Sequence, residues 1–127
     1  MKTTSVLITG VGGQGTLFAS KVFGQLALNL GFDVKLSEVH GMAQRGGSVV
    51  THVRFGDSIA SPIIDKGGAD VLLSFELMET MRWLSYVKPG GNIFANEQKI
   101  LPMPVITGAA EYPSDIKEKL LSLLRVV

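Results

Sequence analysis

A glycine-rich stretch from Gly10 to Gly15 constrains the fold most, because it joins a strand-like run to a helix-like run. The apolar run Val6-Leu7-Ile8 before it predicts a buried strand. From Thr16 to Leu30, apolar residues recur every four positions, which predicts a helix with one broad apolar face. Gly31 suits the position that ends such a helix, and Val34 to Leu36 predicts a second strand. The expected apolar face consists of two rows, Phe18, Val22 and Leu26, and Ala19, Phe23 and Ala27. This order is typical of a parallel β–α–β crossover.

The rest of the chain predicts further strands and helices that complete an α/β domain. Residues 49–55 alternate between two faces, which predicts a strand, and residues 69–75 predict a compact apolar strand. The remaining expected elements are a helix over 76–86 that Lys88 to Gly91 ends, strands at 93–95 and 105–106, and a last helix after Ser114 with Ile116, Leu120, Leu123 and Val127 on its apolar face.

We therefore expect one domain over residues 1–127, of the α/β class, with a Rossmann-like open and mostly parallel sheet and helices on both faces. No helix precedes the strand at 49–55, so the same pattern also allows a mixed sheet. In open α/β sheets, ligands bind outside the carboxyl ends of the strands. The loops after Gly10, Glu38 and Glu76 are therefore expected at one edge.

The glycine loop has two interpretations. Gly10, Gly12 and Gly15 match the pattern G-x-G-x-x-G, in which backbone N–H groups at a helix start can hold a phosphate. The acidic partner of a dinucleotide site lies about 20 residues further on. Asp33 follows Gly15 by 18 residues but precedes the second strand, and Glu38 ends that strand 23 residues on. The alternative is a tight strand–helix turn without a dinucleotide.

The stretch from Ser37 to Ser48 is a second candidate for ligand contact. His40, Gln44 and Arg45 lie close together among the glycines Gly41, Gly46 and Gly47. Arg45 would offer a planar fork of donors suited to phosphate or carboxylate. His40 could serve as a general base, a hydrogen-bond donor or a residue that fixes the loop. A glycine-rich connection with an exposed arginine is the alternative, and His52, within a strand, suits a structural or interface role.

Composition excludes several classes of protein. The net charge of +1 argues against nucleic acid as the main partner, and no apolar run reaches the roughly 20 residues of a membrane helix. Without cysteine the chain can form no disulfide, zinc–thiolate site or cysteine-ligated iron–sulfur cluster, and two histidines leave little material for a metal site. These features fit a cytoplasmic chain that binds no metal.

Two motifs in order, with several shorter matches, make residues 5–117 resemble a known family. The chain is similar to the gamma subunits of 2-oxoacid:ferredoxin oxidoreductases, and among them to the small beta subunit of indolepyruvate ferredoxin oxidoreductase. The matching stretches are Gly10-Val11-Gly12-Gly13-Gln14-Gly15, then Ser37-Glu38-Val39-His40-Gly41-Met42-Ala43-Gln44-Arg45-Gly46-Gly47-Ser48, then Val53-Arg54-Phe55-Gly56, with Ala69 to Leu73 before Glu76 and Lys88 to Gly91.

The resemblance implies a role in the oxidative decarboxylation of a 2-oxoacid, such as indolepyruvate, to an acyl-coenzyme A, with electrons passing to ferredoxin. It also implies that thiamine diphosphate and the iron–sulfur clusters reside in a large partner subunit, and that no cofactor is bound by this chain alone. The loops Gly12 to Gly15 and His40 to Gly47 are expected to contact a phosphate-bearing ligand such as coenzyme A, the partner subunit, or both. Family members usually run on for several tens of residues beyond the last helix, so the resemblance implies that a chain ending at Val127 is truncated or altered at its end.

Three hypotheses follow from the sequence. The chain is an accessory subunit of a 2-oxoacid:ferredoxin oxidoreductase, an independent dinucleotide-binding oxidoreductase of the Rossmann type, or a scaffold subunit with a purely structural role. The second predicts tight nucleotide binding by the isolated chain, and the third predicts that Arg45→Ala leaves turnover intact.

Overall fold

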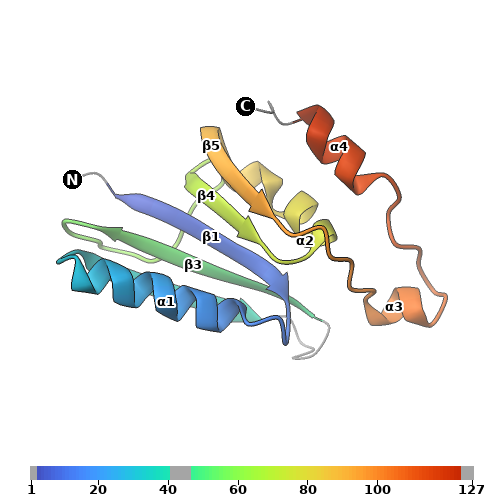
Figure 1. Cartoon of the computed structure of the whole chain (residues 1–127), viewed down its shortest axis with the longest axis horizontal. Helices are drawn as coiled ribbons and strands as arrows, with labels where there is room; N and C mark the ends of the chain where they lie inside the picture. Colours follow the sequence, from blue (N-terminus) through green and yellow to red (C-terminus); the bar gives the residue numbers. More distant parts are fainter. Residues whose placement is uncertain (1–2, 41–46, 124–127) are drawn as a thin grey trace.

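The computed structural model describes residues 3–40 and 47–123, and these form one open sheet with helices on both faces (Figure 1). The elements in chain order are β1 (Thr4–Val11), α1 (Thr16–Asn29), β2 (Asp33–His40), β3 (Ser48–Gly56), β4 (Ala69–Ser74), α2 (Leu77–Arg82), a 3-10 turn η1 (Leu84–Tyr86), β5 (Val87–Ala95), α3 (Met103–Ile106) and α4 (Ile116–Leu123). In this part of the chain, no helix is long and apolar enough to cross a membrane.

The sheet is mixed, with the strand order β2-β3-β1-β4-β5. β1 pairs parallel with β4, and β4 pairs parallel with β5, whereas β3 pairs antiparallel with both β1 and β2. The expected α/β class with an open sheet is confirmed. The expected crossover through α1 is present, but it skips one strand position because β3 lies between β1 and β2.

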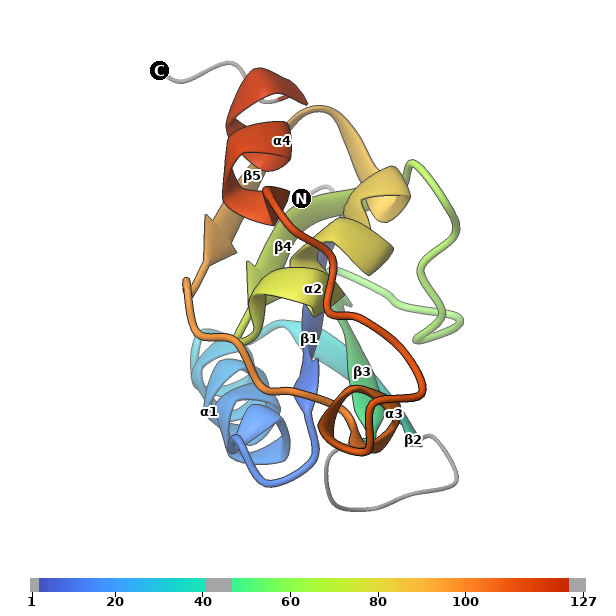
Figure 2. The ribbon, with the colours of Figure 1, turned by 90° about the vertical axis from the view of Figure 1, so that its right-hand side faces the viewer.

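Different helices cover the two faces of this sheet (Figure 2). α1 packs on one face against β1, β2 and β3, and α2 packs on the other face against β1 and β4. β1 serves both cores, because Val6 and Ile8 face the α1 side and Leu7 faces the other. A third cluster joins α2 to α4 through Leu77 and Leu120.

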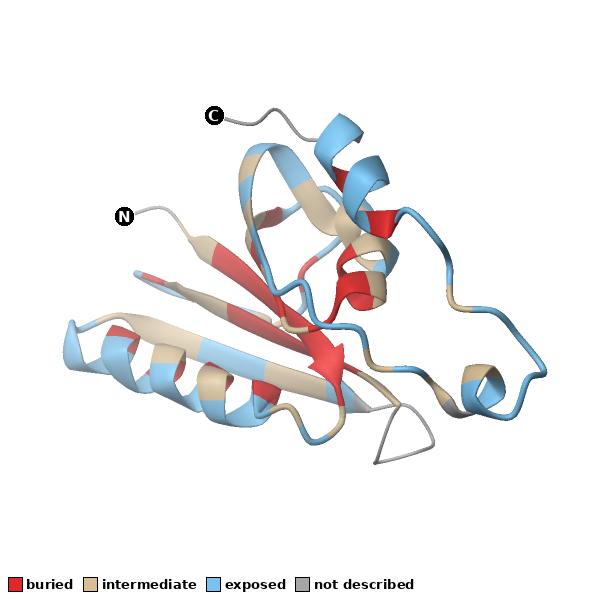
Figure 3. Cartoon of the chain, turned by 45° about the vertical axis from the view of Figure 1, so that its right-hand side comes forward, coloured by how far each residue is buried: buried red, intermediate tan, exposed pale blue. Residues whose placement is uncertain are grey.

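The predicted apolar face of α1 is wrong in one respect, because its row of large residues does not face the core. Phe18 is 73% exposed and Leu26 is 57% exposed, whereas the buried positions are Thr16, Ser20, Gly24 and Ala27 (Figure 3). Small residues are buried because the helix lies close to the sheet. A Cβ placed on Gly24 would lie 3.4 Å from Leu36 Cδ1. From the second row, Ala19 and Phe23 are partly buried against the core and Ala27 is buried.

Three other expectations differ from the structure. Residues 105–106 belong to the short helix α3 and not to a strand. The helix expected over 76–86 divides into α2 and the 3-10 turn η1, and Lys88 to Gly91 lie inside β5. Ile116 and Leu120 are buried in α4 as expected, while Val127 lies outside the described residues.

Candidate functional site

The parallel strands end at one edge of the sheet, and the candidate loops gather there. The glycine loop follows β1, the 41–47 connection joins β2 to β3 as a hairpin, and the segment from Phe75 follows β4. The N–H group of Gly12 donates a hydrogen bond to the carbonyl oxygen of Gly47 at 2.9 Å. The structure therefore joins the glycine loop directly to the end of the second candidate loop.

The glycines of the first loop have distinct structural reasons. Gly13 and Gly15 have φ angles of 96° and 87°, in the left-handed region that favours glycine, and Gly15 is the N-cap of α1. Gly10 lies inside β1, where an added Cβ would approach Thr16 Cγ2 to 2.8 Å and Gln14 Oε1 to 2.9 Å. The turn therefore needs glycine for its own geometry, whether or not a ligand is bound.

Gln14 holds this loop in place. Its Oε1 accepts a hydrogen bond from the N–H of Val11 at 2.8 Å, and its Nε2 donates to the carbonyl oxygen of Phe75 at 2.8 Å. Both ends of the amide therefore bind the backbone, and the side chain links the end of β1 to the end of β4. Gln14, which we expected at a ligand contact, is placed here as a residue that positions the loop.

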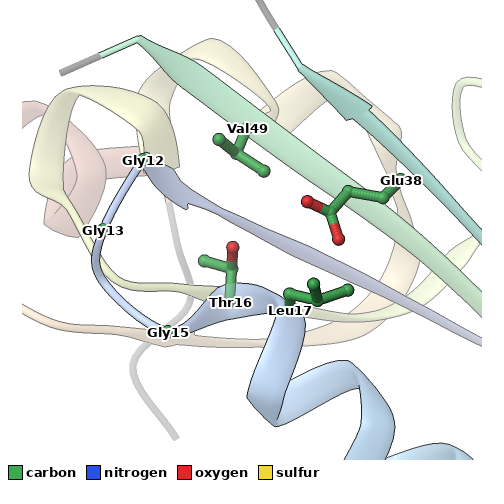
Figure 4. Close-up of a pocket in the computed structure, with 7 residues that line it drawn as sticks. All are labelled: Gly12, Gly13, Gly15, Thr16, Leu17, Glu38 and Val49. Atoms are coloured by element: carbon green, nitrogen blue, oxygen red, sulfur yellow. The ribbon is translucent and has the colours of Figure 1, made fainter. Parts of the chain in front are cut away.

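A pocket of about 340 Å³ lies between the glycine loop and β2 (Figure 4). Of the described residues that line it, Glu38 is the one with a charged side chain. The other lining residues are Gly12, Gly13, Gly15, Thr16, Leu17 and Val49. Glycine N–H groups and a carboxylate together suit a ligand that has both anionic groups and hydroxyl or amine donors.

The two acidic candidates for a dinucleotide site lie far apart. Asp33 begins β2 beside Gly56, at the edge away from the glycine loop. Its Oδ2 accepts a hydrogen bond from the N–H of Ile59 at 2.7 Å, and this bond, with help from Lys35, holds the pKa of Asp33 below its usual value. Glu38 does reach the pocket, but β3 lies between its strand and β1.

A second pocket, of about 460 Å³, lies on the other side of the glycine loop. Asn96, Gln98 and Ile100, which line it, belong to a segment that we call the strap, residues 96–115 between β5 and α4. The other lining residues are Gly12, Gly13, Gln14 and Phe75.

Glu76 fastens the strap to the body of the domain. This side chain is fully buried and caps α2, since its Oε1 accepts a hydrogen bond from the N–H of Glu79 at 2.9 Å. Its Oε2 accepts from the N–H of Ile100 at 3.0 Å and from the hydroxyl of Tyr112 at 2.5 Å. Burial, with the adjacent carboxylate of Glu76, raises the pKa of Tyr112. The sequence carried no signal for this contact of Tyr112.

Glu79 connects α2 to the base of the hairpin. Its side chain is nearly fully buried, and its Oε2 accepts hydrogen bonds from Ser48 Oγ at 2.7 Å and from Trp83 Nε1 at 3.3 Å. Ser48 is the first residue of β3 and follows Gly47. Nothing in the sequence indicated this role of Glu79, because its partner Ser48 lies 31 positions away in the chain.

His52 has a structural role, which is one of the two roles expected from the sequence. It is buried in β3, and its Nδ1 accepts a hydrogen bond from the N–H of Ile64 at 3.0 Å. Burial lowers the pKa of His52, so the ring is neutral near pH 7. Within residues 3–40 and 47–123, no group of three His, Asp or Glu side chains could hold a metal ion.

The remaining candidates belong to the hairpin. His40 is the last residue of β2, opposite Val49 of β3. Gln44, Arg45 and Gly46 lie outside the described residues, so their roles stay predictions.

These features define an open-sheet α/β domain whose ligand edge is built from a glycine-rich strand–helix turn and a β-hairpin. The family model described as pyruvate ferredoxin/flavodoxin oxidoreductase matches residues 5–125. The chain therefore belongs to the pyruvate ferredoxin/flavodoxin oxidoreductase family.

Curated relatives from archaea are similar over most of this chain. It is 49% identical over 114 residues to the indolepyruvate oxidoreductase subunit IorB of Pyrococcus horikoshii, which is 90% of this chain and 56% of the relative. It is 42% identical over 109 residues to the subunit IorB of Archaeoglobus fulgidus, with 86% and 54% covered. The chain thus spans somewhat more than half the length of these relatives.

Solved structures show the same fold. The pyruvate oxidoreductase subunit PORC of Thermotoga maritima matches with a TM-score of 0.64 and 22% identity, over 80% of this chain and 53% of that one. A 2-oxoglutarate:ferredoxin oxidoreductase of Magnetococcus marinus, with 2-oxoglutarate, coenzyme A and succinyl-CoA bound, matches with a TM-score of 0.62 and 16% identity, over 81% and 19%.

Proposed function

We propose that this chain is an accessory subunit of a 2-oxoacid:ferredoxin oxidoreductase. The complex would decarboxylate a 2-oxoacid such as indolepyruvate oxidatively to an acyl-coenzyme A and pass the electrons to ferredoxin. The observation that carries the proposal is the family match over residues 5–125, together with 49% identity to an indolepyruvate oxidoreductase subunit. A chain without cysteine cannot ligate an iron–sulfur cluster through thiolates, so in this proposal the clusters are held by a larger partner subunit.

Within the complex, the ligand edge would receive the phosphate-bearing part of coenzyme A. Three features support this role. The glycine loop opens α1 with backbone N–H groups, the Gly12–Gly47 hydrogen bond brings the hairpin beside it, and Arg45 in that hairpin would supply a charge-assisted contact. The partner subunit would contribute thiamine diphosphate, the iron–sulfur clusters and recognition of the 2-oxoacid.

An independent dinucleotide site has weaker support. Such sites place the acidic residue at the end of the strand next to β1 in the sheet. Here β3 occupies that position, Asp33 lies at the opposite edge, and Glu38 is one strand further away. Isothermal titration of the isolated chain with NAD tests this alternative, and micromolar binding would favour it over the subunit.

The first test uses the chain co-expressed with the large thiamine-binding subunit from the same cells. Titration of the complex with coenzyme A should show a dissociation constant about 10-fold to 150-fold higher for Arg45→Ala than for the native complex, the loss expected for a contact to a charged group. Lys66→Ala is the matched control, because this exposed lysine precedes β4 at the opposite edge.

The same complexes distinguish the other outcomes. Unchanged affinity and turnover in Arg45→Ala would support a scaffold subunit and remove the proposed contact with coenzyme A. A chain that forms no complex with any thiamine- and cluster-bearing subunit would overturn the proposed function itself.

A further inference from the structure

Glu79 is a buried acid behind the ligand edge. Its side chain is 3% exposed, and it is not among the described residues that line either pocket beside the glycine loop. Burial of a carboxylate is costly unless hydrogen bonds or a cation compensate it. Here Oε2 accepts from Ser48 Oγ at 2.7 Å and from Trp83 Nε1 at 3.3 Å, and Oε1 pairs with Nε of Arg82 at 3.2 Å. Three side chains therefore fix the position of this carboxylate.

A short route of hydrogen bonds connects Glu79 to the glycine loop. Ser48, which the carboxylate holds, is the first residue of β3 and pairs with Val11 at the end of β1. The residue before it is Gly47, whose carbonyl oxygen accepts the hydrogen bond from the N–H of Gly12 at 2.9 Å. Gly47 has no side chain that could fix this carbonyl. Among the described residues of the hairpin, the hydroxyl of Ser48 is therefore the side-chain anchor next to the Gly12–Gly47 bond.

Glu79 acts from the face of the sheet opposite to the 340 Å³ pocket. α2 packs on one face of the sheet and α1 on the other (Figure 2). Successive residues of a strand point to opposite faces, so Ser48 faces α2, whereas Val49, which lines the pocket, faces α1. A ligand in that pocket would meet Gly12 and Val49 but not the carboxylate of Glu79.

We propose that Glu79 is a positioning residue of the ligand edge. Its carboxylate holds Ser48, and through Ser48 it keeps the carbonyl of Gly47 on the N–H of Gly12. Gly12 lines both pockets, so this bond sets the conformation in which the glycine loop meets a ligand. If the loop populates that conformation only part of the time, the apparent affinity falls in proportion. The identity of the ligand as coenzyme A rests on the proposed function.

Amide hydrogen exchange of the 127-residue chain tests the positioning role without a ligand. Ser48→Ala removes the hydroxyl, and the N–H of Gly12 should then exchange at least about 10-fold faster than in the native chain, because the loop opens more often. Ser48→Thr keeps a hydroxyl and should restore most of the protection. The N–H of Gly68 is the internal control, since it bonds to the carbonyl of Asp65 at 2.9 Å in a turn before β4, at the opposite edge. Unchanged exchange at Gly12 in Ser48→Ala would overturn the proposal.

Steady-state kinetics of the complex with the large thiamine-binding subunit test the consequence for the ligand. We expect Glu79→Ala and Ser48→Ala to raise the KM for coenzyme A about 10-fold and to leave kcat and the KM for the 2-oxoacid unchanged. Glu79→Gln should stay close to native, because its amide oxygen can still accept from Ser48 and the half-exposed Arg82 can turn to solvent. Ser122→Ala is the matched control, since this exposed hydroxyl bonds within α4 to Lys119. A lower kcat with an unchanged KM for coenzyme A in Ser48→Ala would contradict the positioning role.

A double variant checks the route through Ser48. Because both residues act through one hydrogen bond, Glu79→Ala combined with Ser48→Ala should raise the KM no further than Glu79→Ala alone. Losses that multiply would contradict this route. If Glu79→Ala does not fold, Ser48→Ala decides the proposal by itself. A native complex that binds no coenzyme A would overturn the proposed function instead, and hydrogen exchange at Gly12 would still decide the role of Glu79.

Discussion

Gln14 shows how one amide can define a loop. Its Oε1 accepts a hydrogen bond from the N–H of Val11, and its Nε2 donates one to the carbonyl oxygen of Phe75. One side chain thus satisfies a backbone group at the end of β1 and another just after β4, 64 positions apart in the chain (75 − 11). The glycines around it allow the turn, and Gln14 selects one conformation of it.

Replacement of Gln14 should therefore cost stability at the ligand edge. We expect Gln14→Ala to lower the free energy of unfolding by about 1–3 kcal/mol, because the partly buried N–H of Val11 loses its acceptor. Gln14→Glu keeps that acceptor and loses the bond to Phe75, so its effect should be smaller. Urea unfolding measures both, and equal losses in the two variants would contradict this division of roles.

His52 should make stability depend on pH. Its pKa is lowered in the folded chain by burial, and protonation of the ring would break the bond from Ile64. The unfolded chain binds the proton first, so this contribution is fully present above about pH 6.5 and is lost as the pH falls from there toward the folded pKa. The free energy of unfolding should therefore decrease as the pH falls below about 6.5, and His52→Gln should flatten this decrease. An unchanged slope in the variant would assign the pH dependence to other groups.

Among the elements, the strap is the one that depends most on a single side chain. Apart from the backbone bond between Leu77 and Gln98, its described hydrogen bonds to α2 and its N-cap converge on Glu76 and on the Tyr112 hydroxyl, which also accepts a hydrogen bond from the N–H of Met78. The strap forms one wall of the 460 Å³ pocket, so its attachment also shapes the ligand edge.

Glu76→Gln should release the strap while the sheet stays folded. The new amide nitrogen would face donors from Ile100 and Tyr112, which leaves one of them without an acceptor, while the amide oxygen can still cap α2. We expect trypsin to cleave the variant several-fold faster at Lys99, with little change in circular dichroism. Tyr112→Phe, which removes one of these bonds, should give an intermediate rate. Native-like cleavage of Glu76→Gln would show that the strap is held by other contacts.

For the whole molecule, the central strand β1 ties the two faces together. Leu7 is buried in the core beneath Trp83, while Val6 and Ile8 belong to the core beneath α1. Both cores therefore lose buried side chains when β1 separates from the sheet.

Unfolding should consequently occur as one transition. The fluorescence of Trp83, the single tryptophan, reports on the α2 side, and α1 on the other side, the longest of the described helices, makes the largest single helical contribution to the far-ultraviolet circular dichroism. We expect the two signals to have the same unfolding midpoint. Leu7→Ala should lower the free energy of unfolding by the same amount in both signals, about 2–5 kcal/mol. Separate midpoints would show that the α1 layer unfolds on its own.

The sequence predicts those parts of this molecule that depend on near neighbours. Glycine spacing and apolar runs identify β1, the glycine loop, α1 and most strands, because turn geometry and periodicity are local properties. The inner face of α1 could not be predicted, since the rule that large apolar residues are buried fails where Gly24 allows close contact with β2. The same holds for the site. Its glycines are visible in the sequence, but the contacts of Glu76 to Ile100 and Tyr112 join residues 24 and 36 positions apart.

The hydrogen bond between Gly12 and Gly47 gives the ligand edge a further property. It joins the glycine loop, which lines the 340 Å³ pocket, to Gly47, which directly precedes β3 in the hairpin. A ligand that binds better when the two loops are hydrogen-bonded stabilises this arrangement of both loops. A protein that binds the hairpin in the same arrangement has the same effect. Thermodynamic linkage then requires reciprocity, in which binding of the protein tightens the ligand by the same factor as the ligand tightens the protein.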